Sequence, residues 1–137
     1  FASGDFLTSL NKSQEMLNRF PQTYGEHALY MMGMIYANPE YTYVNYDISI
    51  HFFQKLVKEY PESVFKEKAK IWIWLLNQKI DYAENIDKRN KRIAFLEKKL
   101  ITEKKQIINL QNQIKRLKEI DLGIEERKRE ALPEIGK

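Results

Sequence analysis

The first half of the chain places apolar and polar residues at the spacing of amphipathic helices. Apolar side chains recur at intervals of three and four residues from Phe6 to Phe20, and the run stops at Pro21. The pattern returns about 40 residues later, from Tyr46 to Tyr60, and stops at Pro61. An internal repeat of this length predicts stacked helical hairpins, in which each unit buries its apolar face against the next.

A second kind of helix is predicted between the two prolines. Leu29, Met32, Gly33 and Tyr36 stand at i, i+3, i+4 and i+7. One small residue among large ones lets two helices approach closely, so Gly33 is predicted to be a helix contact point. Trp74 stands at the equivalent position one repeat later. Because a Trp cannot allow the same approach, the repeat array is predicted to end there.

A long helix is predicted to follow. From Glu62 to Leu122 there is neither Gly nor Pro, and a helix over that range is about 90 Å long at 1.5 Å per residue. Apolar residues repeat in it every seven positions, at the a and d places of a coiled coil. We call the predicted partner-binding residues the apolar seam: Ile86, Ile93, Leu96, Leu100, Ile107, Leu110, Ile114 and Leu117. No other segment has a matching heptad, so a second polypeptide is expected to cover it.

The seam does not by itself identify that polypeptide. Ile at most a positions with Leu at several d positions favours two parallel strands. The flanking pairs add little in that arrangement, since Arg92 would attract Glu97 of a second copy while Lys99 would repel Lys104. Self-association is therefore allowed but weakly specified, and a partner helix with acidic flanks fits at least as well.

Two further groups are possible partner-binding residues. Ala94, Ile101 and Ile108 form a second apolar strip beside the seam, to be buried laterally or to dock another protein. Tyr41 and Tyr43 lie in the segment that joins two predicted helices, where exposed tyrosines are typical of recognition surfaces. The alternative for the tyrosines is that they fold back onto the repeat.

The run from Ile71 to Leu76 is apolar on every side of a helix. It contains both tryptophans of the chain, Trp72 and Trp74. A helix that is hydrophobic all round is usually buried, so the run is predicted to be core. A subunit interface is the alternative.

Composition excludes several classes of protein. Hydrophobic residues make up 43% and charged residues 31%, which predicts a folded chain rather than a disordered or membrane-spanning one. The absence of cysteine removes disulfides and thiol chemistry. His27 and His51 have no companions at metal-ligand spacing, and no phosphate loop or nucleophile motif is present. We therefore expect no catalytic site, no metal, no cofactor and no enzyme activity.

Positive charge is concentrated in the long predicted helix. The formal net charge is +4, and the run Lys88–Arg92 resembles the basic region of a leucine-zipper DNA-binding protein. The run overlaps the seam and carries few charges, so a solvated helix face is the preferred interpretation. Nucleic acid is not an expected partner.

These patterns together predict an all-α protein of TPR-like helical hairpins followed by one long helix that forms a coiled coil. The expected boundaries are a helical domain over 1–77, a coiled-coil helix over 78–131 and a flexible tail over 132–137.

The order of parts resembles the TPR-like lipoproteins of bacterial envelopes, which include the assembly lipoprotein BamD and the TolA-binding periplasmic coordinator. It rests on Phe-Pro or Tyr-Pro helix ends, each followed by Glu-x-Ala. With the coil and the ending Lys118–Arg129, the chain is most similar to QseG-type lipoproteins. That resemblance implies a periplasmic protein anchored to the outer membrane by a lipidated cysteine upstream of this chain. It further implies binding to the periplasmic domain of a sensor histidine kinase; the alternative is a self-associating envelope scaffold.

Overall fold

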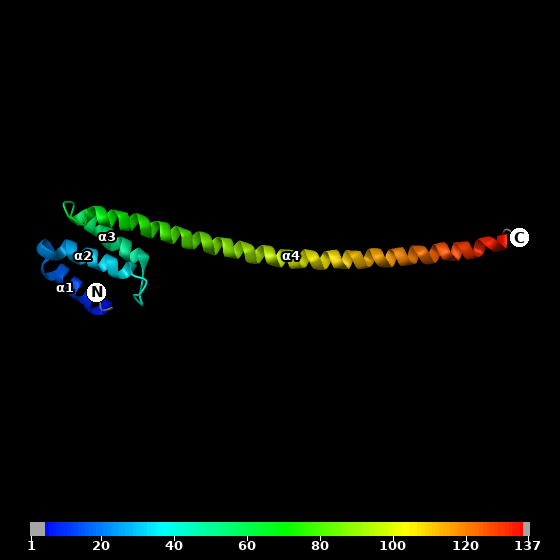
Figure 1. Cartoon of the computed structure of the whole chain (residues 1–137), viewed down its shortest axis with the longest axis horizontal. Coiled ribbons are helices and arrows are strands. Elements are labelled where there is room, and N and C mark those ends of the chain that lie inside the picture. The colour runs from blue at the N-terminus through cyan, green and yellow to red at the C-terminus, as the bar shows by residue number, and fades with distance from the viewer. Residues whose placement is uncertain (1–4, 136–137) are drawn as a thin grey trace. The chain divides into compact units, whose positions relative to one another are not determined.

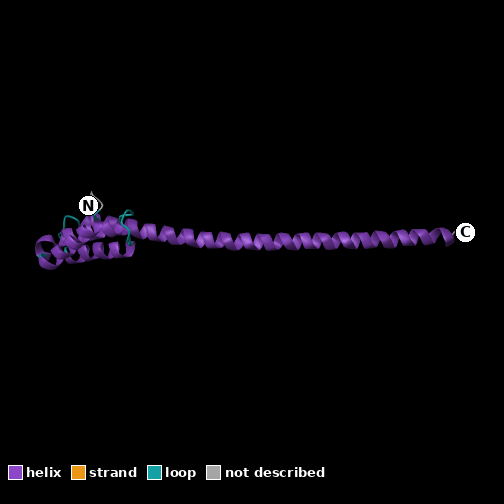
Figure 2. Ribbon diagram, turned by 90° about the horizontal axis from the view of Figure 1, so that it is seen from below, coloured by secondary structure: helices purple, strands orange, loops and turns teal. Residues whose placement is uncertain are grey.

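The computed structural model describes residues 5–135, with side chains through Leu132, as four helices and no strand (Figures 1 and 2). The helices are α1 (Phe6–Arg19), α2 (Pro21–Ala37), α3 (Tyr46–Glu59) and α4 (Lys66–Ile135). The predicted all-α fold of helical hairpins followed by a long helix is thereby confirmed. The two apolar repeats are α1 and α3, and the prolines after them end these helices as predicted.

Local capping chemistry explains where the repeated helices begin. The Asp5 carboxylate accepts a hydrogen bond from the backbone N–H of Thr8 (3.1 Å), and the Asn45 side chain accepts one from Ile48 (3.0 Å). Each cap satisfies a donor that the first turn leaves without a helical partner. The Thr8 side chain, and then its backbone N–H, lower the pKa of Asp5, because their hydrogen bonds favour the charged carboxylate. Pro21 opens α2 at a position that needs no N–H.

Two glycines of α2 set its distance from α3. A Cβ at Gly33 would lie 2.6 Å from the Phe53 ring, and a Cβ at Gly25 would overlap the Tyr60 hydroxyl. The Ser49 hydroxyl donates a hydrogen bond of 2.6 Å to the Gly33 carbonyl, which pins the two backbones at the same place. The predicted close approach at Gly33 is confirmed, and Phe53 is the side chain that uses it.

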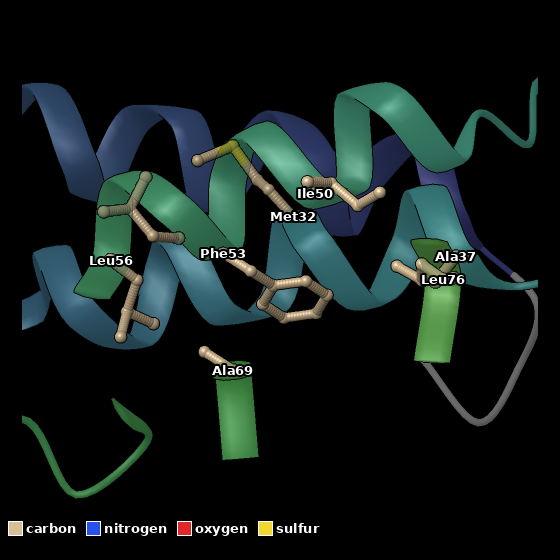
Figure 3. Close-up of a cluster of buried hydrophobic side chains, with 8 residues drawn as sticks. Met32, Ala37, Ile50, Phe53, Leu56, Ala69 and Leu76 are labelled. Carbon is tan, nitrogen blue, oxygen red and sulfur yellow. The ribbon is translucent and has the colours of Figure 1, made fainter. Parts of the chain in front are cut away.

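The core forms where α4 begins against this pair. Figure 3 shows Ala69 and Leu76, on the first turns of α4, in one cluster with residues of α2 and α3. The Trp72 ring stacks on Phe53, with centroids 6.2 Å apart and an interplanar angle of 11°. The buried members of this cluster are Leu29, Met32, Ala37, Ile50, Phe53, Leu56, Ala69 and Leu76. Their burial removes apolar area from water and supplies the main stabilising term.

The chain divides into two compact units that differ from the predicted boundaries. Unit 1 covers Phe1–Ile86 and unit 2 covers Asp87–Lys137. Unit 1 runs past residue 77 because Ile80 packs against the core and the Lys79 ammonium lies 4.8 Å from the Tyr46 ring centroid.

The end of α4 also differs from the sequence prediction. The helix continues past Gly123 to Ile135, so residues 132–135, expected in the flexible tail, are helical. A single helical Gly costs only about 1 kcal/mol, and a Pro near a helix end gives up one backbone hydrogen bond. Residues 136 and 137 lie outside the described residues.

Candidate protein-interaction site

The apolar seam lies on α4, and every one of its residues is exposed. Exposed fractions range from 45% at Leu96 to 62% at Leu117. Residues at a and d positions of one helix share a face, so these side chains form one apolar stripe along the helix. Within the described residues, nothing from the same chain buries this stripe, which is the condition under which a second helix could cover it.

Two charged residues interrupt the stripe and a third follows its end, all at a or d positions of the heptad. Arg89 and Glu103 stand at d positions and Asp121 at an a position, and all three are exposed. The Glu103 carboxylate lies 4.0 Å from the Lys99 ammonium, one turn earlier on the same helix. That separation is at the limit of an ion pair, so Glu103 remains available to a group on another chain.

The second apolar strip is exposed as well. Ile101 and Ile108 are 55% and 58% exposed, and Ala94 is also exposed. The neighbouring Phe95 ring lies under the Arg92 guanidinium at 5.4 Å, an arrangement that shields part of the ring from water. The strip therefore widens the exposed apolar face of unit 2.

The two tyrosines of the 38–45 segment have opposite environments. Tyr41 is 8% exposed and packs against Phe6 (centroids 5.5 Å apart) and Tyr36 (5.7 Å). Its assignment as a possible partner-binding residue is corrected, because the ring folds back onto the helices. Burial also raises its pKa. Tyr43 is 71% exposed and is the tyrosine of this segment that a partner can reach.

The apolar run at the start of α4 is core on one side only. Trp72 and Leu76 pack into the core, whereas Ile71, Trp74 and Leu75 are exposed. The prediction of an all-round buried run is wrong for these three, because α2 and α3 cover a single face of α4. Trp74 stands where a next repeat helix would contact it, and in the described chain no such helix lies over it. The alternative, a subunit interface, stays a prediction.

The residues weighed for other chemistry lie on the surface. His27 and His51 are exposed, and the described chain has no group of three or more metal-ligating side chains. The basic run is an exposed helix face in which Lys91 pairs with Asp87 at 2.9 Å. Among the residues described, no helix combines the length and apolar character needed to cross a membrane.

Sequence reasoning missed the second glycine contact. The Tyr60 hydroxyl donates a hydrogen bond of 2.9 Å to the Pro21 carbonyl and sits in the space left by Gly25. The spacing of Gly25 and Gly33, two small residues on one side of α2, is the signal that could have revealed this contact. The Tyr60 contact with α2 holds α2 and α3 together ahead of α4.

Comparison with known proteins assigns no relative to the chain. No protein-family profile, curated protein or solved structure matches it.

Proposed function

We propose that this protein is a non-catalytic protein-interaction module that binds a helical partner through the apolar seam of α4. The observation that carries the proposal is the uncovered heptad stripe from Ile86 to Leu117. Covering a large aliphatic side chain is worth about 1.5–3 kcal/mol when burial is complete. A helix that repeats such side chains every heptad gains most of that energy by pairing with another helix.

The first candidate partner follows from the resemblance to QseG-type lipoproteins. In this proposal the protein is periplasmic and held at the outer membrane by a lipid anchor upstream of this chain. The seam then pairs with the periplasmic domain of a sensor histidine kinase and alters its signalling. The exposed seam supports this proposal, since an uncovered amphipathic helix can pair with the helices of a helical domain.

The second candidate is a self-associating envelope scaffold for outer-membrane assembly or cell division. The seam then pairs with a further copy, and the helical hairpins of unit 1 hold the other component. The exposed Ile71 and Trp74 support this candidate because they offer unit 1 an apolar contact surface of its own.

Binding measurements with seam variants test the proposal. Ile107→Asp combined with Leu110→Asp puts two charges into the seam. Asn109→Asp combined with Asn112→Asp adds the same two charges at exposed positions outside it. We expect the seam variant alone to lose binding to the periplasmic domain of a candidate sensor histidine kinase, or to lose self-association in sedimentation. A seam variant that retains both would overturn the proposal.

A further inference from the structure

The three charged residues at a and d positions distinguish between directions of helix pairing. In a parallel, in-register pair each a position faces a and each d faces d. Arg89, Glu103 and Asp121 would then each face their own copy, which places like charges together at three levels of the interface. Like charges that are partly removed from water repel strongly, so a parallel pair of this helix is opposed at each of those levels.

An antiparallel pair changes these contacts because a positions then face d positions. With the twofold axis level with Lys105, Arg89 faces Asp121 of the second copy, and the opposite charges attract. The same register matches apolar residues with apolar residues. The facing pairs are Ile86 with Ile124, Ile93 with Leu117, Leu96 with Ile114, and Leu100 with Leu110, each second residue being that of the other copy.

Between Ile86 and Ile124, the central layers are the ones that combine a charge with an apolar residue. There Glu103 faces Ile107 of the second copy. A shift of one heptad in either direction is worse. One shift places Arg89 opposite Lys128, and the other places it opposite Ile114. The charges therefore favour one register as well as one direction.

We infer that α4 pairs with α4 of a second copy as an antiparallel two-stranded coiled coil centred at Lys105. The inference rests on the proposed coiled-coil function of the seam and names its occupant. The residues it pairs are exposed on α4, including Ile124 at 44%. The second apolar strip, Ala94, Ile101 and Ile108, lies at the outer b positions and stays uncovered in this pair. A different protein can therefore bind the strip while the seam is occupied.

Disulfide trapping tests the direction directly, because the chain has no native cysteine. Leu96→Cys and Ile114→Cys are made as separate full-length chains with tags of different size. If the pair is antiparallel, a mixture of the two variants is expected to yield a cross-linked heterodimer on mild oxidation. Neither variant by itself is then expected to yield a cross-linked homodimer. In a parallel pair the two positions lie about 27 Å apart at 1.5 Å per residue, beyond the reach of a disulfide, and each variant cross-links to itself instead.

A charge exchange tests the register. We expect Arg89→Asp or Asp121→Arg alone to weaken dimerisation by about tenfold or more, and the double exchange to restore it. In a parallel pair the double exchange rescues nothing, since like charges still meet. Lys98→Asp with Glu119→Arg, at outer positions, is the matched control and is expected to leave dimerisation unchanged.

The outcomes separate this inference from the proposed function. Self-cross-linking of Leu96→Cys would overturn the antiparallel pair and leave the seam as a binding surface. A monomer in sedimentation would also overturn the antiparallel pair. The proposed function would then depend on whether the seam binds the kinase.

Discussion

Adding one methyl group at Gly33 tests whether the α2–α3 contact controls the stability of unit 1. In Gly33→Ala the new Cβ would lie 2.6, 2.7 and 2.9 Å from three ring atoms of Phe53. Separations below 3.0 Å require something to move. The ring is fully buried, stacks on Trp72 and lies 5.7 Å from the Tyr30 ring, so it cannot swing aside freely.

Two opposing terms set the size of the effect. Overpacking a filled core costs up to about 3 kcal/mol. Replacing Gly by Ala inside a helix returns about 1 kcal/mol of helix propensity. We therefore expect the free energy of unfolding of unit 1 to fall by up to about 2 kcal/mol. A domain of this size loses about 4–8 °C of melting temperature per kcal/mol.

Tryptophan fluorescence reports this contact, because Trp72 of α4 stacks on the Phe53 ring. Trp74→Phe removes the exposed tryptophan and leaves Trp72 on the Phe53 ring as the only one. Urea unfolding is followed with and without Gly33→Ala in that background. Repeating the comparison with Phe53→Leu, which removes the ring, should shrink the cost of the alanine.

A Gly33→Ala variant as stable as the parent protein, or more stable, would refute the predicted clash. An equal loss of stability with and without the Phe53 ring would also refute it, because the ring would then not be the source of the loss.

Two further predictions concern a glycine without neighbours and two tyrosines, of which Tyr41 is buried and Tyr60 is partly buried. Gly123→Ala should stabilise α4 by up to about 1 kcal/mol, because its Cβ would meet nothing within 4 Å. Thermal melting followed by circular dichroism measures this, and a loss of helix would contradict it. Burial raises the pKa of Tyr41 and of Tyr60 above the ordinary value of 10.0. The unfolded chain therefore loses these protons first, so their contribution to stability is complete below pH 10.0 and is lost as the pH rises through the folded pKa. Urea unfolding from about pH 9 to about pH 11 should show a smaller loss in Tyr41→Phe than in the parent, and an equal loss would refute the assignment.

The heptad shows how far local pattern determined the long helix. Seam residues from Ile86 to Leu117 repeat at helical spacing, and no Gly or Pro interrupts them. Their exposure also followed from the sequence, since no other segment carries a matching heptad. The end of the helix did not follow, because Gly123 and Pro133 lower helix stability without forbidding a helix.

The sequence by itself determined the helices of this protein and the small residue at which two of them meet. Apolar spacing, Asx caps and prolines act within a few residues of one another, so they can be read along the chain. Only the tertiary structure decided that Tyr41 is buried while Trp74 is exposed, although both are large aromatic residues. Burial depends on which elements lie over a side chain, and α2 and α3 cover one face of α4, a fact that no local pattern contains.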